Sequence, residues 1–216
     1  MAILQSMLLT NAGFVHALPE RDVTDAELLA ALGVGHVAQT KQVHGACVVD
    51  ALDAGDREAD AMVARAAGGR LAVGVRVADC VPVLVADEAT GDVAAIHAGW
   101  RGVVAGVVRA GVERLKGHSV IAAIGPCIGA CCFEVGRDVA EAIAREAPGA
   151  RVIVHGRADK AYVDLRAAVR GQLRSLGVRD SRIDDVAGCT QHEERFHSFR
   201  RDGANSGRML AAVVTR

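Results

Sequence analysis

The sequence predicts an α+β fold: a single compact domain over residues 1–216, with mixed, mainly antiparallel β-sheets flanked by helices. Strand-like segments often follow one another directly, whereas a doubly wound parallel sheet would separate them by helices. Hydrophobic residues make up 51% of the chain and aromatic residues only 3%, which predicts a core of aliphatic side chains. We find no internal repeat, low-complexity tract or linker, and 216 residues suit one domain.

Charge and composition exclude two classes of partner. The net charge is −1 and no block of like charges occurs, so the chain lacks the clustered basic face that grips nucleic acid. The first residues, MAILQSMLLTNAGF, lack the basic region of a signal peptide, and their apolar runs are too short to span a bilayer. We therefore expect a cytoplasmic protein whose six cysteines are free or bind metal. The oligomeric state stays open.

The first half of the chain predicts a helix, an extended segment and a strand. Residues 24–32, TDAELLAAL, place the capping residue Thr24 before apolar residues at helical spacing. Residues 36–50, HVAQTKQVHGACVVD, are rich in valine and alternate, which predicts extended structure with a bend near Gly45. Residues 70–80, RLAVGVRVADC, show a clear period of two and predict a strand.

Residues 81–97, VPVLVADEATGDVAAIH, predict a β-hairpin around the turn DEAT. If the four residues of DEAT form the loop, Val81 pairs with Ile96, and Cys80 lies opposite His97 one step further along. Directly opposed side chains share a face, with Cβ atoms about 4.5–5.5 Å apart. A thiolate and an imidazole at that separation can bind one metal ion. A slip of one residue would move one of them to the other face.

The second half alternates helical and strand-like patterns. Its apolar periodicities predict helices over residues 99–115, 136–147 and 163–178, and strands over residues 120–125, 151–155 and 208–215.

Two protein ligands are too few for a tight zinc site, because catalytic zinc uses three and keeps one position open. His44 is the candidate for the third, since it also stands beside a glycine at the end of a strand-like segment. Spacing alone does not decide the matter. His44 and His97 are equally well explained as hydrogen-bonded polar residues at strand ends.

Longer motifs add a family resemblance. The segments TKQVHG, DREADAMV, VRVADCVPVLVAD, AAIHAGWRG, AAIGPCIGACCFEVG and SFRRDGANSGRM follow one another in the chain. With them, from about Gln39 to the C-terminus, the chain resembles the multicopper polyphenol oxidase or laccase-domain family. Members are also described as purine nucleoside phosphorylases with adenosine deaminase activity and as peptidoglycan editing factors. The resemblance implies that His44, Cys80 and His97 hold a zinc ion.

The resemblance also implies a function: a zinc-dependent purine nucleoside phosphorylase with adenosine deaminase activity. Its substrates would be phosphate and nucleosides of the adenosine, inosine or methylthioadenosine type. Arg101 is the candidate catalytic residue, because a guanidinium suits phosphate and this one follows His97 by four residues. A solvated surface arginine explains Arg101 equally well. Arg200 and Arg201 are candidate substrate-binding residues.

The remaining motifs have plain alternatives. The loop PCIGACC contains Cys127, Cys131 and Cys132 but no CxxC pair. The resemblance implies that this loop lines the pocket and is not a second metal site. Within it, Cys127 is a third candidate substrate-binding residue. Asp60, in EADAM, matches the family motif or is a structural cap. Trp100 either stacks on a base or packs in the core.

Three other functions compete. Copper-dependent polyphenol oxidation is one, and copper binding in vitro is expected at such a site because copper outranks zinc in affinity. Eight histidines without a His-x-His pair suit a multicopper cluster poorly. A hydrolase with Cys80 as nucleophile, including one that edits peptidoglycan precursors, is the second. The third is a binding module with structural zinc, which normally has four protein ligands.

Overall fold

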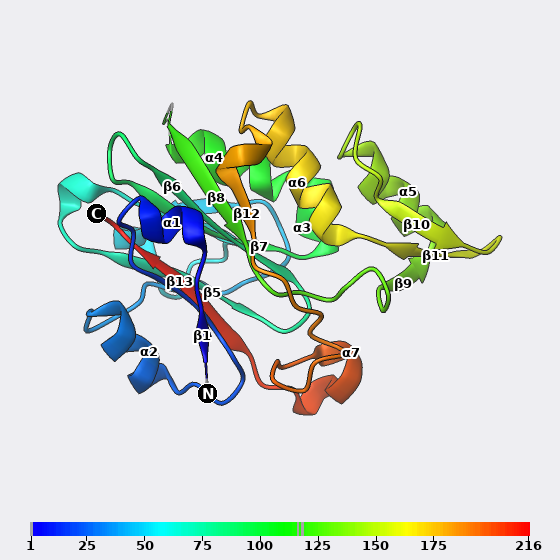
Figure 1. The fold of residues 1–216 in the computed structure, drawn as a ribbon, viewed down its shortest axis with the longest axis horizontal. Coiled ribbons are helices and arrows are strands. Elements are labelled where there is room, and N and C mark those ends of the chain that lie inside the picture. The colour runs from blue at the N-terminus through cyan, green and yellow to red at the C-terminus, as the bar shows by residue number, and fades with distance from the viewer. Residues whose placement is uncertain (1, 116, 118) are drawn as a thin grey trace.

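The computed structural model describes residues 2–115, 117 and 119–216 and confirms the α+β prediction (Figure 1). Its largest sheet has six strands, in the spatial order β12 (Ile183–Asp185), β8 (Val120–Ile124), β6 (Val81–Asp87), β7 (Val93–Ala98), β4 (Ala61–Ala64) and β3 (Val48–Asp50). A four-stranded sheet has the order β1 (Ile3–Leu4), β2 (His16–Pro19), β13 (Met209–Val214) and β5 (Ala72–Val77). A small third sheet contains β10 (Ile153–Gly156), β11 (Lys160–Val163) and β9 (Glu134–Gly136). Pairing is antiparallel except at β12–β8 and β3–β4.

Helices cover the two outer faces of the paired sheets. On the six-stranded sheet lie α3 (Trp100–Ala105), α4 (Val107–Leu115) and α6 (Leu165–Ser175), with α5 (Arg137–Arg145) beside the small sheet (Figure 1). The four-stranded sheet packs against α2 (Asp25–Leu32). Short helices are α1 (Met7–Asn11), α7 (Phe199–Asp202) and the 3₁₀ turns η1 (Ala51–Asp53), η2 (Ala66–Gly68), η3 (Asp180–Arg182) and η4 (Gly203–Asn205).

The six-stranded sheet is buried on both faces, because its side chains alternate between two cores. Val83 and Ile96 point into the core beneath the helices. Leu84 and Ala95 point into the core shared with the four-stranded sheet, where they meet Val75 of β5. All these side chains are fully buried. The continuous apolar runs of β6 and β7 follow from this double burial.

The helix predicted over residues 24–32 forms, and Thr24 caps it as expected. The Thr24 hydroxyl accepts from the backbone N–H of Glu27, while the Glu27 carboxylate accepts from that of Thr24. The helix predicted over residues 99–115 is instead two helices. Gly106 separates α3 from α4 with a φ of 85°, a left-handed conformation that ends a helix.

The predicted hairpin register is wrong by two residues. Val81 pairs with Ala98 instead of Ile96, and Pro82, not Cys80, lies opposite His97. The turn lies one residue later than predicted, because Gly91 adopts a φ of 81° and belongs to the loop. A slip of two residues preserves the face of every side chain, since the strand period is two. Cys80 therefore still lies on the same side of the hairpin as His97, diagonally displaced.

Extended structure over residues 36–50 forms only in part, as β3 at its end. No helix among the described residues is long and apolar enough to cross a membrane.

Candidate metal centre

The structure brings together the three residues predicted as metal ligands. His44 lies in the turn before β3, Cys80 in the turn between β5 and β6, and His97 near the end of β7. One donor atom from each lies within 4.8 Å of the others. The Cys80 Sγ is 3.8 Å from the His44 Nε2, and the two imidazole rings meet edge to face with centroids 4.8 Å apart.

Asp60 ties two of these ligands to each other. Its carboxylate is fully buried. Asp60 Oδ1 accepts from the His97 Nδ1 and from the backbone N–H of His44, both at 2.8 Å. Asp60 Oδ2 accepts from the backbone N–H groups of Gly45 at 2.7 Å and Val43 at 3.2 Å. One carboxylate, in the residue directly before β4, thus holds the His97 ring and the whole turn that carries His44.

These contacts fix the direction of the His97 ring. Because Nδ1 donates to Asp60, Nε2 faces the other ligands. Burial lowers the pKa of His97, but hydrogen bonds to Asp60 and Cys80 outweigh it and raise that pKa to about 9. Burial likewise opposes ionisation of Cys80, yet its contacts with His44 and His97 lower its pKa to about 7. In the metal-free protein the thiolate and the imidazolium stabilise each other.

His44 sits in an unusual backbone conformation. Its φ is 63°, in the left-handed region that non-glycine residues seldom adopt. The hydrogen bonds from this turn to Asp60 offset the strain. Gly99 lies directly behind the ligands: a Cβ there would come within 2.8 Å of the His44 ring and 2.9 Å of the Cys80 Sγ. The backbone conformation of His44 and the absence of a side chain at Gly99 therefore both leave room for the three side chains to come together.

The cluster fits a zinc ion. A thiolate and two imidazoles are donors that zinc prefers, and three protein ligands match catalytic zinc centres. Zinc-binding histidines commonly donate their other ring nitrogen to a carboxylate, as His97 does to Asp60. That these residues bind zinc stays a prediction.

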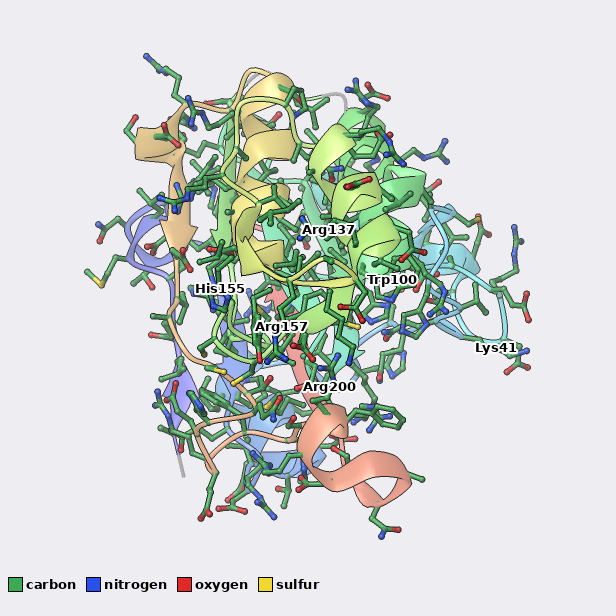
Figure 2. All side chains as sticks on the ribbon, turned by 90° about the vertical axis from the view of Figure 1, so that its right-hand side faces the viewer. Lys41, Trp100, Arg137, His155, Arg157 and Arg200 are labelled. Atoms are coloured by element: carbon green, nitrogen blue, oxygen red, sulfur yellow. The ribbon has the colours of Figure 1, made fainter. Side chains whose placement is uncertain are left out.

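The ligands lie in a cleft of about 630 Å³, a size typical of small-molecule sites. Four arginines line it: Arg76, Arg101, Arg200 and Arg208. Three aromatic side chains also line it: Trp100, Phe133 and Phe199. Figure 2 shows Trp100 and Arg200 on the same side of the molecule. The cleft therefore combines metal ligands, positive charge and flat apolar surfaces.

Asp79 joins the segments that form this cleft. It precedes Cys80 and has a φ of 87°. Its carboxylate accepts from the Thr190 hydroxyl and from the backbone N–H of Arg200, both at 2.6 Å, and its carbonyl accepts from the N–H of Ile128. The turn that carries Cys80 is thereby linked to the cysteine-rich loop and to α7.

The predicted substrate residues divide into two groups. Arg101 and Arg200 line the cleft, with the Arg101 guanidinium 4.4 Å from the Trp100 ring centre. Arg201 is instead bound to backbone carbonyls, including that of Thr190 at 2.9 Å, and to Asp202.

Cys127, the third candidate substrate-binding residue, is not among the residues that line the cleft. It is fully buried beside Arg166, whose Nη2 lies 3.6 Å from the sulfur. Burial raises the pKa of the Cys127 thiol to about 11, so it stays protonated. Its neighbour Ile128 lines the cleft instead.

Sequence reasoning underestimated two acidic residues. The sequence left Asp60 open between a family motif and a structural cap, and it gave no role to Asp79. Asp60 directly precedes β4, which pairs with β7, and Asp79 directly precedes Cys80. For Asp79, its place directly before a candidate ligand was the available signal; Asp60 stands next to no candidate ligand in the sequence.

Comparisons with known proteins find relatives that cover most of this chain. Residues 20–216 match the family described as multi-copper polyphenol oxidoreductase laccase. A protein named adenosine deaminase RL5, from an unknown prokaryotic organism, is 38% identical over 90% of this chain and 82% of its own length. A purine nucleoside phosphorylase from Deinococcus radiodurans is 38% identical over 87% of this chain and 74% of its own.

Solved structures show the same fold. YlmD from Geobacillus stearothermophilus has a TM-score of 0.78 and 31% identity, covering 88% of this chain and 77% of that one. A Neisseria meningitidis protein has the same TM-score of 0.78 at 37% identity, covering 87% and 77% of the two chains. The match over nearly the whole chain, together with these relatives, shows that the protein belongs to the multi-copper polyphenol oxidoreductase laccase family.

Proposed function

We propose that this chain is a zinc-dependent purine nucleoside phosphorylase that also deaminates adenosine. The observation that carries the proposal is the cleft, in which three side chains able to bind a metal lie among arginines and aromatic rings. The names of the relatives support the same chemistry. Phosphate and purine nucleosides of the adenosine, inosine or methylthioadenosine type are the proposed substrates.

His44, Cys80 and His97 would hold the zinc. When bound, zinc supplies a Lewis acid that polarises a substrate oxygen or activates water. Asp60 keeps a proton on the His97 Nδ1, so that Nε2 offers its lone pair to the metal. The same carboxylate fixes the backbone of His44. These residues therefore position the ligands before substrate arrives.

The arginines would orient the phosphate. In phosphorolysis a phosphate oxygen bonds to the ribose C1′ as the bond from C1′ to the purine nitrogen breaks, and the purine leaves with a proton. The Arg101 guanidinium lines the cleft and lies over the Trp100 ring, and no salt bridge among the described residues involves it, so it is available to an anion. Arg76, in contrast, is paired with Asp25.

The aromatic residues would hold the base. Trp100 and Phe133 line the cleft, and flat apolar rings stack favourably on a purine. In deamination, water adds at C6 of adenosine and ammonia leaves. The two reactions act on different atoms of one bound nucleoside, which is why one cleft can serve both.

The test uses purified protein with adenosine and phosphate, followed by separation of the products. We expect inosine from deamination, and adenine with ribose 1-phosphate from phosphorolysis. The His97→Ala variant should lose bound zinc and both activities together. If zinc-loaded protein forms none of these products, the proposal is wrong.

Copper-dependent phenol oxidation has weaker support. A multicopper oxidase needs a blue-copper site and a three-copper cluster, which together use many imidazoles. The two groups of described residues able to hold a metal contain only three histidines: His44, His97 and His192. Oxidation by copper-loaded protein would reflect the intrinsic affinity of copper for such donors.

A hydrolase that uses Cys80 is the second candidate, favoured by one observation. Asp60, His97 and Cys80 form a carboxylate–imidazole–thiol chain, and the pKa of Cys80 is lowered to about 7. Added zinc distinguishes the two functions. A metal-binding Cys80 is protected from alkylation and activity rises with zinc, whereas a nucleophilic Cys80 is inhibited by zinc.

A further inference from the structure

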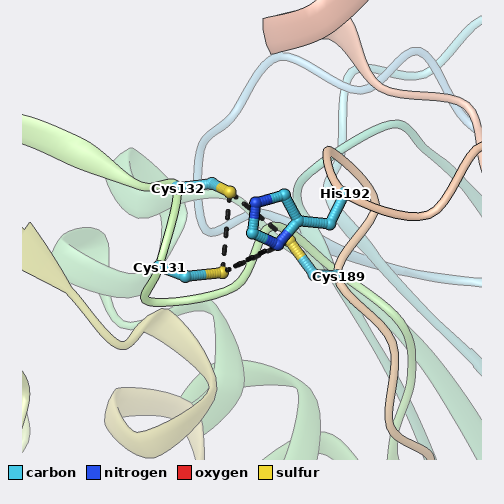
Figure 3. Close-up of side chains that lie close together, drawn as sticks. All are labelled: Cys131, Cys132, Cys189 and His192. Atoms are coloured by element: carbon cyan, nitrogen blue, oxygen red, sulfur yellow. Dashed lines mark hydrogen bonds between the residues drawn. The ribbon is translucent and has the colours of Figure 1, made fainter.

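A second group of metal-binding side chains lies outside the site described above. Cys131 and Cys132 come from the loop before β9, and Cys189 and His192 from the loop after β12 (Figure 3). One donor atom from each of the four lies within 4.8 Å of the others. The sequence interpretation of this loop as no second metal site does not include Cys189 and His192, which come from a distant loop.

The spacing of the donor atoms matches a tetrahedral metal site. The Sγ atoms are 3.5 Å apart for Cys131–Cys132 and 3.8 Å apart for Cys131–Cys189 and Cys132–Cys189. The His192 Nδ1 lies 3.5 Å from the Cys131 Sγ. A tetrahedral zinc ion requires about 3.8 Å between two sulfurs and about 3.6 Å between sulfur and nitrogen, given its bond lengths. All four measured edges agree to within a few tenths of an ångström.

The arrangement does not represent disulfide bonds. All six cysteines are free thiols. A disulfide would place two sulfurs about 2.05 Å apart, and it would use two thiols and leave the third unpaired. Here each of the three sulfurs lies 3.5–3.8 Å from the other two, and the His192 Nδ1 lies 3.5 Å from one of them. Contacts of this length among three sulfurs and a nitrogen are those of donors around one metal ion.

The backbone holds both loops in place around this group. The Cys189 segment pairs with Cys127, and the Thr190 N–H donates to the Cys127 carbonyl. The Gly129 N–H points at the Cys189 Sγ over 3.2 Å. A Cβ at Gly129 would come within 3.1 Å of both the Cys131 and Cys189 sulfurs. The loops therefore approach as closely as a glycine allows, with the sulfurs facing inward.

We propose that Cys131, Cys132, Cys189 and His192 bind a second zinc ion in a closed, structural site. Three thiolates and one imidazole complete its coordination, so no position is left for substrate. The site joins two segments far apart in the sequence. It also supports the cleft, because Arg200 donates to the carbonyl of Cys132. This proposal does not rest on the proposed nucleoside chemistry.

Zinc analysis of the purified chain tests the proposal. We expect about two zinc ions per chain, falling to about one in Cys189→Ser, in His192→Ala and in His97→Ala, because each removes one ligand set. His192 is exposed, so its replacement leaves the fold intact even where the cysteine variant is unstable. Cys47→Ser is the matched control, since Cys47 is exposed and lies outside both groups.

Cobalt provides an independent readout. In the His97→Ala chain, added cobalt should give an intense thiolate charge-transfer band with the visible spectrum of tetrahedral cobalt. Adding His192→Ala should change that spectrum, and adding Cys189→Ser should weaken the band. The proposal is wrong if the Cys189 and His192 variants keep all of the zinc of the unchanged chain, or if the His97→Ala chain with cobalt shows no such band. Either result would leave zinc binding at the His44 site and the nucleoside activities unaffected. Failure of this proposal can therefore be distinguished from failure of the proposed function.

Discussion

Replacing Asp60 by asparagine tests the central contact of the candidate metal centre. The substitution keeps the size of the side chain and removes its charge. Each carboxylate oxygen of Asp60 accepts from two donors: His97 Nδ1 and the His44 N–H on one, the Gly45 and Val43 N–H groups on the other. An amide has only one acceptor oxygen. Whichever way it is placed, its NH₂ group faces two donors.

The structure sets the size of the effect. Two donors are left unsatisfied at a site from which water is excluded, and each costs about 1–3 kcal/mol. The free energy of unfolding should therefore fall by about 2–6 kcal/mol, a large share of the total stability of a domain. The ring of His97 also loses the partner that orients it, and such a change weakens metal binding by about 10–100-fold.

Two measurements check this prediction. Urea unfolding of the metal-free protein gives the free energy of unfolding, and competition with a chromophoric chelator gives the zinc affinity. Asp184→Asn is the matched control. Its carboxylate also accepts from backbone and hydroxyl groups, those of Leu8, Asp185 and Ser6, but it lies in β12, outside the ligand cluster. It should reduce stability and leave the zinc affinity of the His44 site unchanged.

The reasoning is refuted if Asp60→Asn unfolds at the urea concentration of the unchanged protein and binds zinc equally well. A loss of stability with unchanged zinc affinity would show that Asp60 supports the turn without orienting His97.

Three further predictions follow from other contacts. Gly99→Ala should weaken zinc binding at least about tenfold, because the new Cβ would lie within 2.9 Å of the His44 ring and of the Cys80 sulfur. Gly35→Ala is the control: a Cβ there has no neighbour within 4 Å, so zinc binding should stay unchanged. Burial lowers the pKa of His16, so the unfolded chain binds the proton more readily and stability should fall as the pH drops below about 6.5. Urea unfolding at two pH values should show a smaller difference in His16→Gln, and an equal difference would contradict the assignment. Arg101→Ala should reduce kcat/KM for phosphorolysis by at least about tenfold, with KM for phosphate raised, whereas the exposed, salt-bridged Arg109→Ala should match the unchanged protein.

Much of the fold was predictable because its elements carry strong local patterns. The period of two in residues 70–80 and the cap at Thr24 depend only on neighbouring residues, and both elements form. The two errors have local causes as well. Gly91 adopts a positive φ in the hairpin loop, and Gly106 adopts one that ends helix α3. Because glycine populates positive and negative φ about equally, its presence in a sequence does not predict which of the two it adopts.

The sequence shows which donor side chains are available for the first site. Through the resemblance it also predicts which three of them, His44, Cys80 and His97, belong together. It did not determine how they are held. Asp60 and Asp79 act through backbone groups far away in the sequence, and such contacts leave no periodic signal. The cluster of Cys131, Cys132, Cys189 and His192 likewise depends on contacts between residues that are far apart in the sequence. Parallel pairing between Cys127 and Cys189 places two distant loops side by side, so the tertiary structure decides that four donors scattered along the sequence lie within 4.8 Å of one another.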